Sequence, residues 1–427
     1  MHVLDLRGPG QGHEHWGRLC ARSAGLEGPA DVAAREVIAA VRERGDAAVA
    51  ELTLRFEGRQ LGRFELTPHE RAAACEAIPS ELRHALDLAA NNIRRFHATQ
   101  LPRDTGLHDD DTHLVSRARP LRRVAVYAPG GTAAYPSSVL MTAIPAKVAG
   151  VAEVILFTPR PDPVVLLAAE LAGVDRVFSV GGAQAIAAAA LGTRQIPRVD
   201  KIVGPGNAYV TAAKRQVFGL VDIDGIAGPS EVLILADHSA DPTLVAADLL
   251  AQAEHDVLAC PIAVTCHPAL VEPLRRALAE QLETLPRRDI AARALADHGA
   301  IVLVHDRDAM VAAANDYAPE HLELLVHDPR ALLDRLHSAG AIFVGPHTPE
   351  AAGDYTAGPS HVLPTAGGAR FSSPLGCWEF VRYTSVLHLS PEQLREQAEA
   401  ITTLARAEGL EGHARAVEHR LNPRLKS

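Results

Sequence analysis

The chain has 427 residues, of which 47% are hydrophobic and 22% charged, enough for two or three globular domains with ample cores. Its formal net charge is −10 at neutral pH, which argues against the basic surface typical of a nucleic-acid-binding protein. We therefore expect no nucleic-acid partner.

The apolar segments and the cysteines indicate a cytoplasmic protein. Residues 1–8 lack the apolar core of a signal peptide. The uncharged stretch 124–146 is interrupted by glycine and proline, so it is a poor membrane helix and we expect no membrane partner. An odd number of widely spaced cysteines predicts free thiols in a reducing compartment; they are Cys20, Cys75, Cys260, Cys266 and Cys377.

Residues 1–123 are predicted to be a helical N-terminal region that packs on the domain after it. From residue 124 to residue 229, short apolar runs alternate with helical segments, and several runs end in turns that contain glycine. The predicted strands of this series lie at 124–127, 154–157, 176–180 and 201–203.

A second alternating series fills residues 230–376, with predicted strands at 232–235, 262–265, 301–304 and 342–344. Strands that alternate with helices favour parallel sheets covered on both faces. The predicted fold class is therefore α/β, with two Rossmann-like parallel-sheet domains. Residues 377–427, helical from about Trp378, are either a helix on the chain's own domain or an arm that packs on a partner subunit.

Glycine turns of the first series are candidates for cofactor binding, because ligands of open α/β sheets bind at the carboxyl ends of strands. No Gly-x-Gly-x-x-Gly motif is present, and the run from Gly204 to Tyr209 fits only its first half. Backbone amides at these turns could hold a pyrophosphate, but the pattern alone does not identify NAD.

A helix expected after Pro242 carries a first group of candidate ligands. Asp241 is placed to cap this helix and Pro242 to begin it. Asp248, Gln252 and His255 follow at i, i+4 and i+7, so they share one helix face. The spacing of Gln252 and His255 suits two ligands of one metal ion, although two polar surface residues give the same pattern.

The pair Glu320-His321 can supply two acid–base groups of different pKa; the alternative is a charged turn before a strand. The loop 353–364 is rich in glycine and proline, and its polar residues are candidates for binding. Asp354 is a plausible metal carboxylate and His361 a plausible substrate contact, although a plain loop explains them too.

Taken together, these segments resemble the histidinol dehydrogenase family from about residue 30 to His413. Many separate motifs occur in the family's order. They are Tyr127-Ala128-Pro129-Gly130-Gly131, Tyr135 to Met141, Gly181 to Ile186, Gly204-Pro205-Gly206-Asn207, Ala227 to Glu231, the run around Gln252 and His255, the Glu320-His321 pair, the His361 loop and Gly367 to Gly376.

The resemblance implies a homodimer that oxidises L-histidinol to L-histidine through the aldehyde, with two hydride transfers to NAD. It implies one Zn²⁺ per subunit and a C-terminal arm that completes the partner's site. The implied zinc ligands are Gln252, His255, Asp354 and His413.

In the same family, His321 would be the base for the alcohol proton and Glu320 would activate water for the second oxidation. The zinc ligands and His321 would also contact the substrate, together with Ser230, His361 and Glu408. The implied NAD contacts are Tyr127, Gln184 and Asn207.

Three positions depart from the family pattern without removing a catalytic or metal residue: Pro359-Ser360 before His361, Gly225, and Cys377-Trp378. The first departure puts the geometry of His361 in question. Two other activities stay open, namely a dehydrogenase of the same fold acting on another small alcohol, such as a sulfonated diol, and a zinc hydrolase using Glu320 or Glu254. An inactive binding protein is disfavoured by the intact Glu320-His321 pair.

Overall fold

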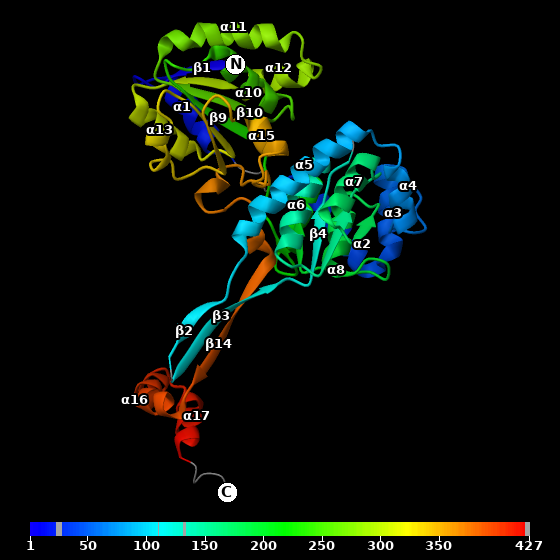
Figure 1. Cartoon of the computed structure of the whole chain (residues 1–427), viewed down its shortest axis with the longest axis vertical. Coiled ribbons are helices and arrows are strands. Elements are labelled where there is room, and N and C mark those ends of the chain that lie inside the picture. The colour runs from blue at the N-terminus through cyan, green and yellow to red at the C-terminus, as the bar shows by residue number, and fades with distance from the viewer. Residues whose placement is uncertain (23–27, 110, 131–133, 423–427) are drawn as a thin grey trace. The chain divides into compact units, whose positions relative to one another are not determined.

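The computed structural model describes residues 1–22, 28–109, 111–130 and 134–422 (Figure 1). Gly131, part of one family motif, lies outside these residues. The chain divides into two compact units. The first contains residues 1–100 and 121–380, and the second contains residues 101–120 and 381–427.

A five-stranded parallel sheet organises the first alternating series. Its order, β6-β5-β4-β7-β8, corresponds to 3-2-1-4-5 in chain order, as in doubly wound folds. The strands are β4 (Arg123–Tyr127), β5 (Glu153–Phe157), β6 (Arg176–Phe178), β7 (Lys201–Val203) and β8 (Asp222–Ile223).

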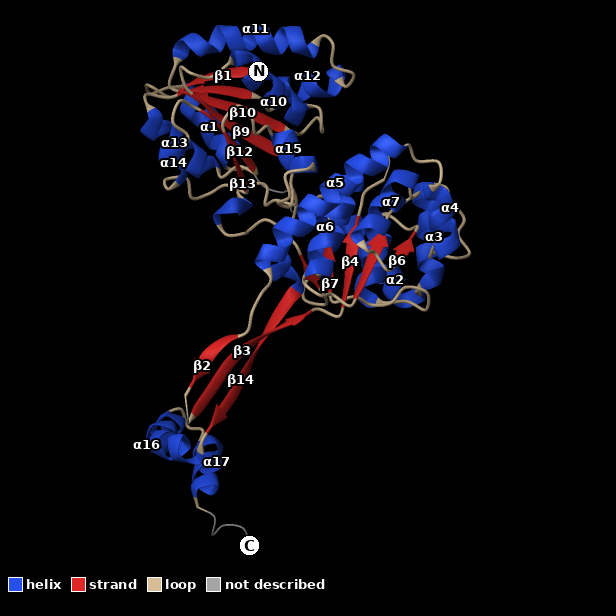
Figure 2. Cartoon of the chain, viewed as in Figure 1, coloured by secondary structure: helices blue, strands red, loops and turns tan. Residues whose placement is uncertain are grey.

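Helices from this series and from the N-terminal region cover the five-stranded sheet (Figure 2). Val124, Ala125 and Val126 of β4 are fully buried, which explains why the run reads as continuously apolar. The helices are α2 (Pro29–Arg44), α3 (Asp46–Glu57), α4 (Pro68–Cys75), α5 (Ser80–His97), α6 (Pro136–Val148), α7 (Pro163–Ala172), α8 (Gly182–Leu191) and α9 (Ala208–Val217).

The second series forms a six-stranded parallel sheet of order β1-β11-β10-β9-β12-β13. Without β1, this is again the order 3-2-1-4-5, so the prediction of two Rossmann-like sheets of similar plan is confirmed. The strands are β1 (His2–Asp5), β9 (Glu231–Ala236), β10 (Cys260–Thr265), β11 (Ala300–Leu303), β12 (His321–Leu325) and β13 (Ala341–Val344).

The structure divides the N-terminal region between the two sheets. Strand β1 pairs with β11 at the edge of the six-stranded sheet, and α1 packs beside it, whereas α2 packs on the five-stranded sheet's helices α8 and α9. The helices of the second series and α1 are α1 (Gln11–Cys20), α10 (Pro242–Ala253), α11 (Val271–Leu282), α12 (Arg288–Asp297), α13 (Arg307–Tyr317), α14 (Arg330–Leu333) and α15 (Glu350–Tyr355).

The second unit contains an antiparallel sheet of order β14-β3-β2 and two helices. The prediction that the tail is helical from about Trp378 is wrong for β14, whose β-branched and aromatic residues favour a strand paired with β3. The elements are β2 (Thr105–His108), β3 (Thr112–Pro120), β14 (Val381–Leu389), α16 (Pro391–Ala407) and α17 (Glu411–Leu421). Among the described residues, no helix is both long and apolar enough to span a membrane.

Candidate active site and metal-binding cluster

The candidate catalytic residues lie at the amino edge of the six-stranded sheet. Glu231 is the first residue of β9 and His321 the first residue of β12, and the register pairs His321 with Val232. Ligands of open α/β sheets usually bind at the opposite, carboxyl edge. The site of this chain therefore departs from the usual rule for its fold.

Helix α10 brings Gln252 to this edge. The side chain of Asp241 accepts a hydrogen bond from the Thr243 N–H at 2.8 Å, and Pro242 begins the helix, which confirms the predicted cap. The helix ends at Ala253, so the prediction that His255 lies on its face is wrong. The N–H of His255 instead donates to the Gln252 carbonyl at 3.2 Å in a turn that continues past the helix end.

Three side chains meet as a possible metal-binding cluster: His255, Glu350 and Asp354 offer ligand atoms that all lie within 4.8 Å of one another. Gln252 joins this cluster because its fully buried amide contacts the Glu350 carboxylate. The structure thus brings together three predicted ligands, Gln252, His255 and Asp354. Sequence reasoning missed Glu350, although its i, i+4 spacing from Asp354 was a readable signal.

The electrostatics of the cluster suit a cation. Burial raises the pKa of Glu350 well above its usual range, and the neighbouring Asp354 carboxylate adds to the rise. A cation offsets the cost of gathering carboxylates in a buried place, and nitrogen and oxygen donors are the ligands that Zn²⁺ accepts.

The main-chain N–H and carbonyl of Glu231 hold the two members of the acid–base pair. The N–H donates to Glu320 Oε2 at 2.9 Å, and the carbonyl oxygen lies 2.9 Å from His321 Nδ1. Because a carbonyl can only accept, Nδ1 carries the proton and His321 Nε2 keeps a free lone pair. Nε2 lies 3.9 Å from Asp354 Oδ1, on the side of the metal-binding cluster.

Burial shifts the pKa values of His321 and Glu320 in opposite directions. It lowers the pKa of His321 to about 4, against the attraction of Asp354, so the imidazole is neutral near pH 7 and can accept a proton. Burial also raises the pKa of Glu320 well above its usual range, and the Glu231 carboxylate is the next cause. Environments that separate two pKa values in this way are typical of acid–base sites.

An ion pair with Arg22 holds the side chain of Glu231 in place. Arg22 donates through two nitrogens to the Glu231 carboxylate, which also accepts from the Ala366 N–H at 3.0 Å. The Arg22 guanidinium lies 3.4 Å from the centre of the Tyr317 ring. Nothing in the local sequence around Arg22 signals this role, because its partners are hundreds of residues away.

Hydrogen bonds connect the loop of His361 to the site and to the helices α5 and α6. His361 Nδ1 lies 3.1 Å from the Asp354 carbonyl oxygen. Ser360, one of the departures from the family pattern, is buried and donates to the Met141 carbonyl at 3.1 Å, and Asn92 donates to the Thr356 carbonyl at 2.9 Å. These bonds keep His361 beside Asp354 despite the changed loop sequence.

The remaining predicted substrate and metal residues divide between the two units. Ser230 directly precedes β9 and is half-buried at the same sheet edge. Glu408, at the end of α16, and His413, in α17, are exposed residues of the second unit. They are therefore no part of the cluster found within the first unit.

The three residues expected to contact NAD line one cavity of about 960 Å³ at the carboxyl edge of the five-stranded sheet. Tyr127 ends β4, Gln184 lies in the first turn of α8, and Asn207 caps α9. This is the edge, and the place between β4 and β7, at which doubly wound sheets bind nucleotides.

Hydrogen bonds within the protein determine which atoms of Asn207 and Tyr127 remain available to a ligand. Asn207 Oδ1 accepts from the N–H groups of Tyr209 and Val210 at 3.1 Å each, so its amide nitrogen is left to donate. The Tyr127 hydroxyl accepts from the Gly182 N–H at 3.0 Å, and burial raises its pKa to about 12, so it stays a neutral phenol.

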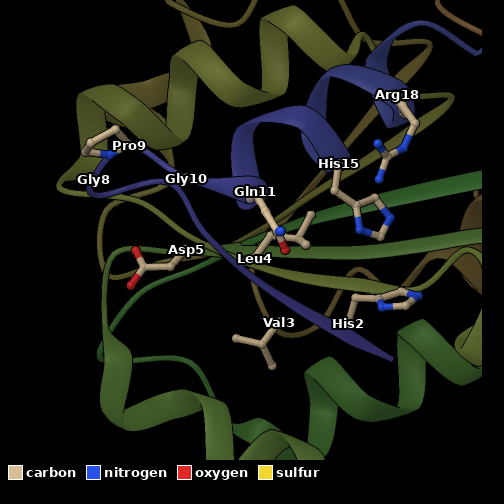
Figure 3. Close-up of a pocket in the computed structure, with 11 residues that line it drawn as sticks. His2, Val3, Leu4, Asp5, Gly8, Pro9, Gly10, Gln11, His15 and Arg18 are labelled. Carbon is tan, nitrogen blue, oxygen red and sulfur yellow. The ribbon is translucent and has the colours of Figure 1, made fainter.

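Another cavity, of about 550 Å³, lies at the N-terminal strand and α1 (Figure 3). His2, Asp5, Gln11, His15 and Arg18 are among its lining residues, and none of the predicted site residues is. It is therefore separate from the catalytic and cofactor candidates.

A buried acid–base pair beside a possible metal-binding cluster, together with a cavity at the carboxyl edge of a doubly wound sheet, is typical of an oxidoreductase. The sequence model of histidinol dehydrogenase matches residues 23–421. The chain belongs to the histidinol dehydrogenase family.

Similar proteins support this assignment over nearly the full length. The histidinol dehydrogenase of Syntrophotalea carbinolica is 52% identical over 394 residues, covering 90% of this chain and 91% of the relative. That of Aquifex aeolicus is 48% identical over 430 residues, covering 99% and 100%. A crystal structure of histidinol dehydrogenase from Elizabethkingia anophelis covers 100% of this chain and 99% of its own, with 35% identity and a TM-score of 0.92.

Proposed function

We propose that this protein oxidises L-histidinol to L-histidine through L-histidinaldehyde, as the last step of histidine biosynthesis, with two molecules of NAD reduced. It acts as a cytoplasmic homodimer with one Zn²⁺ per subunit. The observation that carries the proposal is the neutral His321, whose free Nε2 lies beside the metal-binding cluster in a chain about half identical to histidinol dehydrogenases.

The residues that would hold zinc are Gln252, His255 and Asp354, with His413 supplied by the partner's arm. Bound zinc would supply a positive centre that orients the substrate through its imidazole and amino group. Ser230, His361 and Glu408 complete the substrate contacts.

In the first oxidation, His321 Nε2 takes the proton from the substrate hydroxyl while hydride leaves the adjacent carbon. The bond from Nδ1 to the Glu231 carbonyl holds the imidazole in the tautomer that this step needs. Bound NAD, contacted by Tyr127, Gln184 and Asn207, supplies the hydride acceptor for both oxidations.

In the second oxidation, Glu320 takes a proton from the water that hydrates the aldehyde. A carboxylate whose pKa is raised by burial is a stronger base than an exposed one. The bond from the Glu231 N–H fixes one carboxylate oxygen, Oε2, and leaves Oε1 to act on water.

Counting products tests the reaction. With purified enzyme and limiting histidinol, we expect two NADH per histidinol and a loss of turnover when a zinc chelator removes the metal. A ratio of one would contradict the two-step oxidation, and full activity after verified metal removal would contradict the zinc role.

The same assay distinguishes the other activities. A dehydrogenase of another small alcohol would turn over a sulfonated diol faster than histidinol, and a hydrolase would act on its substrate without NAD. Either result would replace the proposed function.

A further inference from the structure

Glu350 is the one member of the metal-binding cluster to which the proposed function gives no role. It begins α15 and is 2% exposed, and Asp354 lies one turn later on the same helix. Its backbone N–H donates to Glu323 Oε1 at 2.9 Å, which fixes the start of the helix against β12. A buried carboxylate held this firmly needs a partner for its own oxygens.

That partner is the amide of Gln252. With the amide nitrogen turned to Glu350, Nε2 lies 2.6 Å from Oε1 and 3.0 Å from Oε2. When Glu350 is ionised beside a cation, the opposite orientation would set the amide oxygen against both carboxylate oxygens at these distances, which is repulsive because a carboxylate can only accept. Glu350 therefore selects one orientation of a side chain that is itself fully buried.

We propose that Glu350 is a positioning residue: it holds the amide nitrogen of Gln252 so that the amide carbonyl oxygen is the atom presented to the cation. The inference rests on the proposed zinc site. An amide is a weak and rotatable metal ligand, and partners beyond the ligands commonly fix such groups. Glu350 acts through Gln252 and does not itself bind the metal.

Metal binding in the full-length enzyme tests the proposal. Glu350→Gln removes one of the two acceptors and the preference for a single amide orientation. We expect it to weaken Zn²⁺ binding about 10- to 100-fold, the range found for such partners. Competition with a chromophoric chelator measures this affinity without any assay of activity.

A double-mutant cycle separates positioning from direct coordination. If Glu350 acts through Gln252, Glu350→Gln lowers affinity in the native chain and has no further effect in a Gln252→Ala chain. Equal losses in both backgrounds would make Glu350 a ligand and overturn the proposal, as would no loss in either. The visible spectrum of the Co²⁺-substituted enzyme gives a second readout, because a lost direct ligand changes the coordination number.

Glu323→Gln is the matched control. It makes the same isosteric change in a buried neighbour, and its amide can still accept from the Glu350 N–H and donate to Asp248. We expect its Zn²⁺ affinity to stay within about twofold of the native value, whereas a loss equal to that of Glu350→Gln would show a general effect of buried charge and overturn the specific role. Native enzyme that fails to bind Zn²⁺ would contradict the proposed function itself, so the two failures are distinguishable.

Discussion

Hydrogen bonds to main-chain groups fix the orientation of the side chains of the acid–base pair. His321 has one ring nitrogen bound to a carbonyl oxygen and the other free, so its tautomer is set before any substrate arrives. Glu320 contacts the N–H of the same residue, Glu231, yet burial moves its pKa in the opposite direction. Burial at one place thus separates the pKa values of the two groups.

His321→Asn tests the base. The Asn amide can still donate to the Glu231 carbonyl, but it offers no basic nitrogen, so we expect kcat to fall about 100- to 10,000-fold with KM changed little. Steady-state kinetics with histidinol measure this. A fall of less than about fivefold would contradict the role of His321.

Glu320→Gln tests the second oxidation. The amide cannot accept the proton from water, so hydration of the aldehyde slows while the first oxidation continues. We expect NADH formed per histidinol to fall from two toward one, with aldehyde trapped by a hydrazine reagent. A ratio that stays at two would assign water activation to another group.

The cysteines give a pH-dependent prediction. Burial raises the pKa values of the Cys20, Cys260 and Cys377 thiols to about 11 each. The thiolate is the reactive form, and at pH 8 only about 0.1% of such a thiol is ionised, against about a quarter of an ordinary one. We expect slow alkylation by iodoacetamide at pH 8, rising tenfold per pH unit, with all five cysteines reacting after unfolding.

Mass spectrometry of the alkylated peptides checks this. Rapid labelling of Cys20, Cys260 or Cys377 in the folded protein at pH 8 would contradict it. The same experiment counts free thiols, and the structure has all five cysteines unpaired.

Close backbone packing between the starts of β12 and β13 positions Glu320 and His321. Gly340 donates to the Pro319 carbonyl and Ala341 to the Glu320 carbonyl, each at 2.9 Å. A Cβ atom on Gly340 would lie 2.6 Å from the Glu320 carbonyl oxygen. The ladder that positions the acid–base pair thus has no room for a side chain at this point.

Gly340→Ala therefore forces the two strands apart. We expect a loss of about 1–3 kcal/mol in stability, the usual cost of overpacking, and a fall in kcat because Glu320 moves with its backbone. Thermal unfolding and steady-state kinetics measure the two effects. Gly62→Ala, where a Cβ meets nothing within 4 Å, is the control and should leave both unchanged; equal behaviour of the two variants would refute the packing explanation.

The sequence predicted the two sheets because their strands are short, apolar and separated by helices. It missed β12 because His321 and Glu323 look like surface residues, although both are buried, at 4% and 1% exposure. Alternating polar and apolar residues normally indicate a strand with one solvent-exposed face, whereas the polar face of β12 is buried at the site. In the same way, β14 was missed because its residues had no visible partner until β3 paired with them.

The candidate site was predictable only as separate fragments. The spacing of Gln252 and His255 and the Glu320-His321 pair were visible, and the family resemblance joined them. Their meeting at the amino edge of the sheet depends on strand order and on contacts between residues about 90 positions apart, such as Glu231 and Glu320. No local pattern contains that information, and the same holds for Arg22.

At the scale of the whole molecule, the division of the chain into two units bears on whether a dimer is needed to complete each active site. Glu408 and His413 belong to the unit that lacks the acid–base pair. If the arm completes a partner's site, two chains that are inactive for different reasons can complement each other.

Mixing His321→Ala and His413→Ala enzymes tests this exchange. In a random mixture half the dimers are mixed, and each mixed dimer has one intact site, so we expect about a quarter of native activity. Each variant alone is the control and should be inactive. No recovery after verified subunit exchange would mean that each chain builds its site alone.

The contacts of the main-chain N–H and carbonyl of Glu231 have a consequence for how this enzyme can change over evolutionary time. A point substitution replaces a side chain but leaves the carbonyl oxygen in place, and only proline removes the N–H. The orientation of both Glu320 and His321 is thus encoded by chain path and not by residue identity at position 231. Sequence drift can retune the charge around the pair through Arg22, whereas misalignment requires a displacement of the backbone, by a clash such as that expected at Gly340 or by a shift in strand register.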